Sequence, residues 1–153
     1  MLEHIVLHYV NDNIDFILYN RRHRFRRGLS CETQLCGTYH ELARSMNNAK
    51  SVHAIILDFK KTFDKAPHDL LLKKLHKIQD IHPQIINWIR NFLTKRRQQV
   101  VIDRNTPHSL PVCSGVPQGY VLGPTLFLIY INNLPDHLDC NVSLFADNTL
   151  IYQ

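Results

Sequence analysis

The sequence predicts an α+β fold in which helices back an antiparallel sheet. The short apolar run Ala54–Leu57, which ends at Asp58, is typical of a buried strand. Residues 142–152 are typical of two short strands joined by a tight turn. The segments between these strands carry apolar residues at the spacing of amphipathic helices. A chain of 153 residues suggests one domain, and its 44% hydrophobic content can supply a core.

Two helices are predicted before the first strand. Apolar residues at helical spacing indicate one helix near the N-terminus: Ile5, Val6, Tyr9 and Val10. Ser30 is a favourable N-cap for a second helix, which we expect to run from about Cys31 to Met46. The apolar residues of this second helix fall on one face, which we expect to pack in the core: Leu35, Tyr39, Leu42 and Met46.

Three helices and a hairpin are predicted after this strand. Residues 69–78 carry leucines on one helical face and lysines elsewhere, which predicts an amphipathic helix. Pro83 suits the first turn of a further helix with apolar residues at helical spacing. Residues 98–102 and 109–112 predict the two strands of a hairpin. The helix 122–132 is apolar on most sides, so we expect it to lie under the sheet as core.

Asp58 and Asp147 are the carboxylates that the predicted sheet would bring together. A charge at the end of a buried strand needs a partner. For Asp58 this is solvent or a helix N-terminus, the lysines Lys60 and Lys61, or a metal ion. Asp147 and Asn148 tolerate the positive φ angles of a tight turn, so the pair predicts the hairpin tip. Two carboxylates that share Mg²⁺ are the recurring device for nucleotidyl transfer.

Basic residues cluster in two places in a chain with a formal net charge of +5. Residues 21–27 contain five arginines and one phenylalanine, which suits either a solvated basic loop or phosphate contact with base stacking. Residues 95–97, Lys-Arg-Arg, suit the C-terminal end of a helix or contact with a nucleic-acid backbone. Composition alone leaves open both a polyanionic partner and a merely basic soluble protein.

The sequence indicates an intracellular protein that does not cross a membrane. None of the four cysteines belongs to a Cys-x-x-Cys pair, so no zinc site is predicted. Because no secretory signal is present, we expect reduced thiols. The longest apolar run, residues 121–131, is interrupted by Gly123 and Pro124 and is too short to span a bilayer.

Three motifs resemble those of the reverse transcriptases of non-LTR (LINE-type, jockey-like) retrotransposons. The family's motif A is similar to residues 57–68, LDFKKTFDKAPH, and its motif B to residues 114–124, SGVPQGYVLGP. Its motif C is similar to residues 145–148, FADN, where the family has FADD. The motifs occur in the family's order and similarity runs between them, so the resemblance covers nearly the whole chain.

The resemblance implies a partial right-hand polymerase, with a palm sheet, partial fingers and no thumb. Residues 1–50 would be a fingers remnant and helix, and residues 51–153 the palm with motifs A, B and C. The implied activity is RNA-directed DNA synthesis on an RNA template and a DNA primer, with deoxynucleoside triphosphates as substrates. Two Mg²⁺ ions are the expected cofactors, with Mn²⁺ as a substitute.

The resemblance also implies roles for individual residues. Asp58, Asp147 and Asn148 would be catalytic, and the metal contacts would come from Asp58, Asp147 and the backbone carbonyl of Phe59. Two segments would contact nucleic acid. The first matches the family's basic segment and comprises Arg24, Phe25, Arg26 and Arg27. The second is the other basic cluster and comprises Lys95, Arg96 and Arg97.

Phe63, five residues after Asp58, matches the family's steric gate. A bulky ring at that position excludes a ribose 2′-hydroxyl and so selects deoxynucleotides. From the residues alone, without the surrounding motif, ordinary core packing is the favoured explanation of Phe63. Gln118 and Gly119 would contact the incoming nucleotide, and we expect Asp64 to be structural, bonded to a backbone amide.

This chain departs from the family pattern in composition and length. Asn148 stands where the family has a second aspartate. This replacement keeps an oxygen ligand but removes one negative charge. Loss of a supporting group costs roughly 10–100-fold in metal affinity or activity. Arg24 replaces a glycine, and Tyr120 is bulky where the family has a small residue and would crowd the template side. The family also extends beyond Met1 and Gln153, so we expect exposed apolar faces.

Three hypotheses for the chain's function follow. It is an active polymerase fragment, or a catalytically inactive relic that at most binds nucleic acid, or part of a longer intact enzyme. For the chain by itself, Asn148 and the two truncations favour the second hypothesis, whereas the predicted fold is the same under all three.

Overall fold

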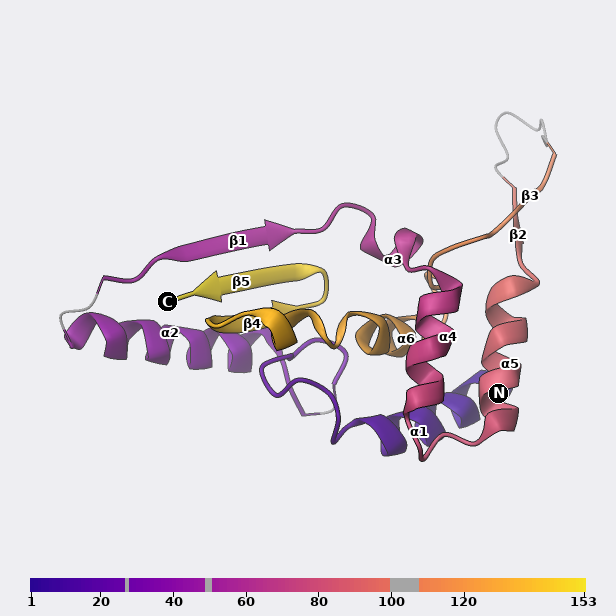
Figure 1. Ribbon diagram of the computed structural model, residues 1–153, viewed down its shortest axis with the longest axis horizontal. Coiled ribbons are helices and arrows are strands. Elements are labelled where there is room, and N and C mark those ends of the chain that lie inside the picture. Colours follow the sequence, from indigo (N-terminus) through magenta and orange to yellow (C-terminus); the bar gives the residue numbers. More distant parts are fainter. Residues whose placement is uncertain (27, 49–50, 100–107) are drawn as a thin grey trace. The chain divides into compact units, whose positions relative to one another are not determined.

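The chain forms two compact units. The first comprises residues 1–14 and 61–130. The second comprises residues 15–60 and 131–153. Figure 1 labels their helices and strands. A computed structural model describes the following residues: 1–26, 28–48, 51–99 and 108–153.

The second unit is built on a three-stranded antiparallel sheet of order β1-β5-β4 (Figure 1). Its strands are β1 (Ala54–Asp58), β4 (Asn141–Phe145) and β5 (Asn148–Tyr152). The short helix η1 (Leu134–His137) precedes β4. The hairpin predicted for residues 142–152 is therefore confirmed, and its second strand pairs with β1. The register places Asn148 between Asp58 on one side and Phe145 on the other.

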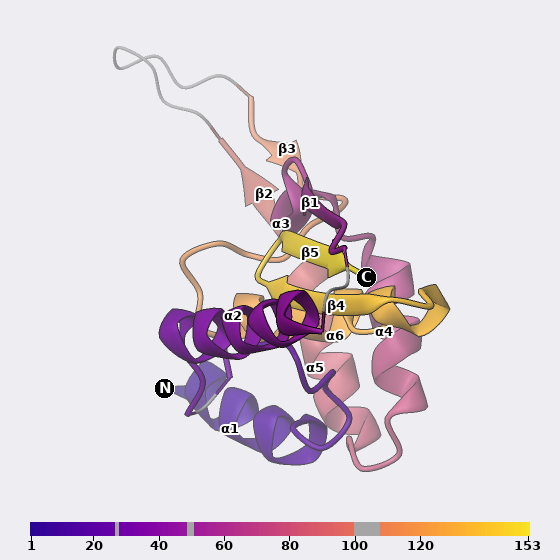
Figure 2. The same ribbon diagram turned by 90° about the vertical axis from the view of Figure 1, so that its left-hand side faces the viewer.

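Helix α2 (Cys31–Asn47) lies along β4 and contacts it through polar side chains (Figure 2). Ser30 caps this helix as predicted, because its hydroxyl accepts from the Thr33 amide at 3.2 Å. In return the Thr33 hydroxyl accepts from the Ser30 amide at 2.9 Å, which completes a capping box. Gln34 donates from its side-chain amide to the Ser143 hydroxyl at 2.7 Å and so joins the helix to the sheet.

The apolar face of α2 is not core, so that prediction is wrong. Leu35 is 68% exposed, Tyr39 72% and Met46 69%, and Leu42 is only half-buried. All residues of α2 are described, and none of them is buried. Polar side chains on the adjacent stripe of the helix, such as Gln34, bond to the sheet. The apolar stripe is thereby turned toward solvent.

Strand β1 forms at the predicted residues but is not buried as predicted. All five of its residues are exposed, and Ile56 is 77% exposed. The reason is its position: β1 is an edge strand that pairs only with β5 among the described strands, while α2 lies against β4 (Figure 1). A strand that is apolar in four of its five residues therefore lies at an open edge of the sheet.

The tip of the β4–β5 hairpin lies one residue earlier than predicted. Ala146 and Asp147 form the turn, because Asn148 already pairs with Phe145 as the first residue of β5. Ala146 adopts a φ of 54°. Two-residue hairpin turns with a positive φ at the first position favour glycine. An alanine there is strained by about 1–2 kcal/mol.

The first unit consists of helices and a short hairpin. Its helices are α1 (Leu2–Ile14), α3 (Thr62–Lys65), α4 (His68–Lys77), α5 (Pro83–Thr94) and α6 (Leu122–Ile131), of which the last extends one residue beyond the unit. The predicted helices at 69–78, from Pro83 onward and at 122–132 are confirmed. Helices α4 and α5 lie side by side (Figures 1 and 2).

The core of this unit comes from apolar side chains of α1, α4, α5 and α6. Fully buried side chains on these helices include Leu71, Leu75, Ile89, Leu93, Leu122 and Leu126. Pro83 lies in the first turn of α5, where its missing N–H costs no hydrogen bond. On α6 seven of the ten residues are buried, as expected from a helix that is apolar on most sides.

The hairpin of the first unit pairs β2 (Arg97–Gln98) with β3 (Leu110–Pro111) in antiparallel register. The remainder of the predicted first strand, residues 100–102, lies outside the described residues. None of the helices in the described part of the chain is long and apolar enough to cross a membrane.

Candidate active site

The two carboxylates singled out by the sequence both lie in the second unit. Asp58 ends β1 directly opposite Asn148, and Asp147 occupies the turn that precedes Asn148. Asp58 is exposed and Asp147 half-buried. Within the described residues, neither carboxylate forms an ion pair, not even with the neighbouring Lys60. Nor is Asp58 the cap of α3, whose N-cap position is Lys61.

The oxygen donors at the end of β1 and at the β4–β5 turn fit a hard divalent cation. Mg²⁺ prefers one or two carboxylates and keeps several waters. Asp58 and Asp147 supply carboxylates without a counter-ion among the described residues, and Asn148 adds an amide oxygen. Among those residues no group of three or more His, Cys, Asp or Glu side chains gathers at one point. The substitution at Asn148 thus leaves this edge with a neutral third donor.

Arg24 and Phe25 lie beside the same hairpin. The Arg24 guanidinium is 5.0 Å from the Phe145 ring centroid and 5.1 Å from that of Phe25, within the range of cation–π contacts. Both residues are exposed. The positive φ of this loop, 62°, belongs to Phe25 and not to Arg24. Replacement of a glycine by Arg24 therefore does not place a side chain at the left-handed position.

The other described arginines of this cluster are engaged inside the protein. Arg26 pairs with the Asp15 carboxylate at 2.9 Å. Arg21 pairs with Glu41 at 2.9 Å, and the Tyr152 hydroxyl donates to the same carboxylate. Burial and this bond to Glu41 raise the pKa of Tyr152 to about 12. Within residues 21–26, Arg24 and Phe25 are thus the exposed side chains, and Arg27 lies outside the described residues.

Arg22 is completely buried at the junction with β4. Its Nη2 donates to the Ile131 carbonyl at 3.3 Å. Its Nε and Nη1 have no hydrogen-bond partner among the described residues. Burial, with a smaller contribution from the charge of Arg26, lowers the pKa of Arg22 to about 10. This cation is therefore a destabilising element of the second unit.

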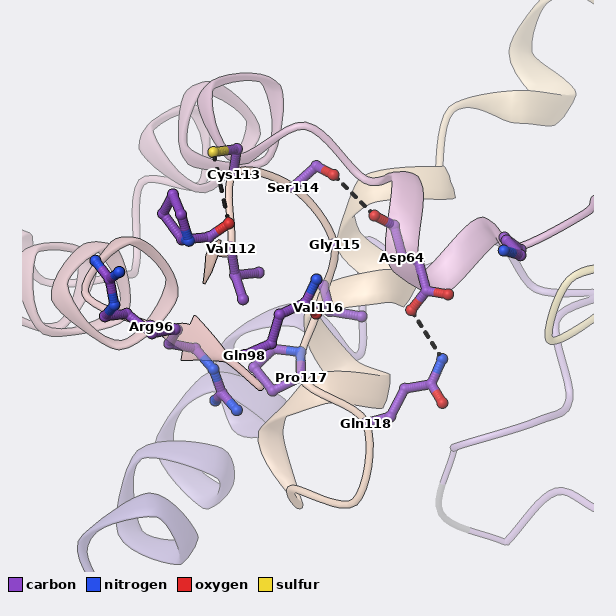
Figure 3. A pocket seen from close by; sticks show the side chains of 13 residues that line it. Asp64, Arg96, Gln98, Val112, Cys113, Ser114, Gly115, Val116, Pro117 and Gln118 are labelled. Atoms are coloured by element: carbon purple, nitrogen blue, oxygen red, sulfur yellow. Dashed lines mark hydrogen bonds between the residues drawn. The ribbon is translucent and has the colours of Figure 1, made fainter. Parts of the chain in front are cut away.

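The predicted nucleotide-binding residues lie in the first unit, where Gln118 lines a cavity of about 620 Å³ (Figure 3). Phe63 and Gly119 belong to the same unit but are not among the residues that line this cavity. The cavity is lined by α3, by the base of the β2–β3 hairpin and by the glycine-rich segment 113–118. Gln118 donates from Nε2 to the Asp64 carboxylate at 3.1 Å, and the Ser114 hydroxyl donates to the Asp64 backbone carbonyl at 2.9 Å. The Asp64 carboxylate thus accepts from a side-chain amide, whereas the sequence predicts a bond to a backbone amide.

Backbone hydrogen bonds hold the glycine-rich segment against α3. The Gly115 amide donates to the Ala66 carbonyl at 2.8 Å, and the Val116 amide to the Phe63 carbonyl at 2.7 Å. Buried His68 donates from Nε2 to the Gly115 carbonyl at 2.9 Å. Gly115 has a φ of +88°, and a Cβ there would lie 2.7 Å from the Asp64 carbonyl oxygen. Only glycine permits this approach.

Phe63 serves partly as core. It is half-buried, and its ring stacks on Phe127 with a centroid distance of 4.2 Å and an interplanar angle of 26°. A ring fixed in this way on one face is rigid, as a steric gate has to be. The two interpretations of Phe63 are therefore compatible.

In the second basic cluster, residues 95–97, Arg96 lies against two aromatic rings. The Arg96 guanidinium lies 4.4 Å from the Tyr120 ring centroid and 5.5 Å from that of Phe92. Arg97 donates to the Ser109 hydroxyl at 2.9 Å across the base of the hairpin. Lys95 is exposed at the C-cap of α5. The bulky Tyr120 thus packs against an arginine of its own unit.

Comparison with known proteins identifies the family. A family model described as reverse transcriptase (RNA-dependent DNA polymerase) matches residues 4–153. The chain belongs to the reverse transcriptase family. Members of this family use divalent metal ions, in keeping with the oxygen donors that Asp58, Asp147 and Asn148 supply.

The relatives place this reverse transcriptase segment among jockey-like, non-LTR elements. The RNA-directed DNA polymerase from mobile element jockey of Drosophila melanogaster is 30% identical over 115 residues, which cover 70% of this chain and 12% of the relative. The probable RNA-directed DNA polymerase from transposon BS, also of D. melanogaster, is 30% identical over 121 residues, 78% of this chain and 13% of the relative. The chain therefore spans about an eighth of the length of these relatives.

A solved structure shows the same fold. Telomerase from Candida albicans, solved in complex with a fragment of telomeric RNA, superimposes with a TM-score of 0.67 at 13% identity. The match covers 99% of this chain and 30% of that one. The predicted α+β fold of a partial polymerase palm is confirmed.

Sequence reasoning about this reverse transcriptase segment missed two partners of the glycine-rich segment. Asp64 holds the Gln118 side chain, and His68 holds the Gly115 backbone. These contacts join residues 54 and 47 positions apart, so no local pattern could reveal them. The only signal was proximity in sequence to Asp58 and Phe63.

Proposed function

We propose that this chain carries the catalytic core of an RNA-directed DNA polymerase. In the proposed reaction a primer 3′-hydroxyl attacks the α-phosphate of a deoxynucleoside triphosphate on an RNA template, and pyrophosphate leaves. The observation that carries the proposal is the arrangement of Asp58, Asn148 and Asp147 at one end of the sheet. Asp58 faces Asn148 across two paired strands, Asp147 precedes it in the turn, and neither carboxylate is neutralised by an ion pair in the described chain.

Asp58, Asp147 and the backbone carbonyl of Phe59 would hold two Mg²⁺ ions, with Mn²⁺ as a substitute. Bound divalent ions supply stabilisation of the attacking and leaving oxygens of the displacement. Asn148 would offer a neutral amide oxygen, so the edge holds one negative charge fewer than an aspartate pair would. We therefore expect weak metal binding as the main handicap of this chain.

The remaining predicted residues would bind and orient the substrates. Phe63, stacked on Phe127, would exclude a ribose 2′-hydroxyl, and Gln118 with Gly119 would contact the sugar. Arg24 and Phe25 would meet nucleic acid through charge and stacking, since both are exposed. Their counterparts in the second basic cluster would contact the template backbone: Lys95, Arg96 and Arg97.

Primer extension on an RNA template, with Mg²⁺ and then with Mn²⁺, tests the proposal. The chain would be compared with Asp58→Ala and Asn148→Asp. We expect extension that Asp58→Ala abolishes and Asn148→Asp increases by about tenfold or more, the lower bound for restoring a supporting ligand. Folded protein that extends no primer in any variant would contradict the proposal and leave nucleic-acid binding as the function of this chain.

A further inference from the structure

Asp64 is an exposed residue that accepts hydrogen bonds from two residues of the glycine-rich segment. Its Oδ1 accepts from Gln118 Nε2 at 3.1 Å, while its backbone carbonyl accepts from the Ser114 hydroxyl at 2.9 Å (Figure 3). In the described residues this carboxylate takes part in no ion pair, although Lys61 lines the same cavity. The bond to Gln118 is therefore not a by-product of charge pairing.

The chemistry of the two groups determines which way the Gln118 amide points. An ionised carboxylate can only accept hydrogen bonds, so Gln118 must turn its NH₂ group toward Asp64. The amide oxygen Oε1 then points elsewhere, as an acceptor for a hydroxyl. Without Asp64 the exposed Gln118 side chain could rotate freely and present either end.

The backbone around Gln118 is held independently of the Asp64 side chain. The amides of Gly115 and Val116 donate to the carbonyls of Ala66 and Phe63. Truncation of Asp64 at its carboxylate leaves both of these bonds in place. A change at Asp64 therefore alters the orientation of Gln118 with little effect on the path of the segment.

We propose that Asp64 is a positioning residue for Gln118, which it holds with the amide oxygen available to a hydroxyl of the deoxynucleotide sugar. The inference rests on the proposed function, since it assigns Gln118 to the incoming nucleotide. It adds a sugar-orienting role for a residue that touches Gln118 and not the reacting atoms.

The variants needed are Asp64→Ala, Asp64→Asn, Gln118→Ala and the double variant Asp64→Ala/Gln118→Ala. Asparagine at this position retains an acceptor oxygen, but its neutral bond is about half as strong as a charge-assisted one. Asp69→Asn, on the exposed side of α4, is the matched control because it removes a carboxylate of the same unit outside the cavity.

The first readout requires no turnover. The side-chain ¹⁵N amide resonance of Gln118, identified by its disappearance in Gln118→Ala, would be followed with and without dTTP. We expect Asp64→Ala to move this resonance and to weaken dTTP binding by about 3–10-fold, with Asp64→Asn between it and the unmodified chain. We expect no effect of Asp69→Asn. A Gln118 resonance that is the same in Asp64→Ala would overturn the inference whatever the activity.

The second readout is primer extension. We expect Asp64→Ala to raise the KM for the nucleotide by a similar factor while kcat changes less than twofold, and the double variant to be no worse than Gln118→Ala. A KM increase in the double variant that equals the product of the increases in the two single variants would overturn the inference. If dTTP neither binds nor is incorporated, the proposed function fails and the sugar-orienting role with it. The Asp64-dependent resonance would then show that only the hydrogen bond was correctly identified.

Discussion

The segment that carries Gln118 and the turn that carries Asp147 are held in opposite ways. Backbone bonds from Gly115 and Val116, and a side-chain bond from Asp64, fix the first. The second contains a strained alanine, and its carboxylate has no ion pair among the described residues. The difference matches the ligands that we propose for the two sites. A sugar is recognised by groups positioned in advance, whereas a cation brings the missing countercharge with it.

The largest effect on stability is expected from a substitution at Gly115, where the glycine-rich segment approaches α3 most closely. Gly115→Ala places a Cβ at 2.7 Å from backbone oxygen in a residue with φ +88°. We expect the free energy of unfolding of the first unit to fall by about 3 kcal/mol, from backbone strain and overpacking together. Urea denaturation measures this loss.

Gly119→Ala is the matched control for that prediction. Gly119 also has a positive φ, +78°, but a Cβ added there would have no described atom within 4 Å. Strain alone should then cost about 1–2 kcal/mol. Equal losses in both variants would mean that contact with α3 does not constrain the segment.

The second unit should become more stable when its buried cation is removed. Arg22→Met deletes a guanidinium with two nitrogens that lack partners in the described chain. We expect a gain of about 2 kcal/mol, the usual cost of an unsatisfied buried polar group. Arg24→Met, at an exposed position, should change stability by less than about 0.5 kcal/mol.

The pH dependence of this gain has a definite sign. The pKa of Arg22 is lowered from its ordinary value to about 10 in the folded protein, so between these values the unfolded chain binds more protons. The stability contributed by this group in the unmodified protein therefore rises with pH in that window. The advantage of Arg22→Met should be complete below pH 10 and shrink above it. An advantage that is constant up to about pH 12 would contradict the assignment.

Restoring a carboxylate at the sheet edge should strengthen metal binding. Asn148→Asp places a second negative charge directly opposite Asp58. We expect the apo protein to lose up to about 1 kcal/mol through cross-strand repulsion. We expect Mg²⁺ affinity to rise at least tenfold, about 1.4 kcal/mol. The melting temperature at increasing Mg²⁺ measures both, and adding Asp58→Asn to the variant should cancel them.

The smallest effect is expected at the hairpin tip. Ala146→Gly relieves the strain of a φ of 54°, less the entropy that glycine loses on folding. We expect a net gain of about 0.5–1 kcal/mol in thermal unfolding. Ala43→Gly, inside α2, should lose a similar amount. A loss at both positions would show that the turn is not strained.

Much of the local structure could be predicted from the sequence. Ser30 caps α2 and Pro83 opens α5 as expected, because capping depends on groups within a few residues of one another. The hairpin was predicted correctly, but its turn lies one residue earlier than expected. The strand that ends at Asp58 and the turn at Asp147 were enough to predict that the hairpin tip lies beside the end of this strand.

The sequence by itself determined which segments are helices and strands, because those preferences arise from neighbouring residues. Only the tertiary structure decided which side of an element is covered. The apolar stripe of α2 and the apolar strand β1 are both exposed, because their burial depends on distant partners and not on their own pattern. The same holds for Asp64, whose bond to Gln118 spans 54 residues and exists only once α3 and the glycine-rich segment meet.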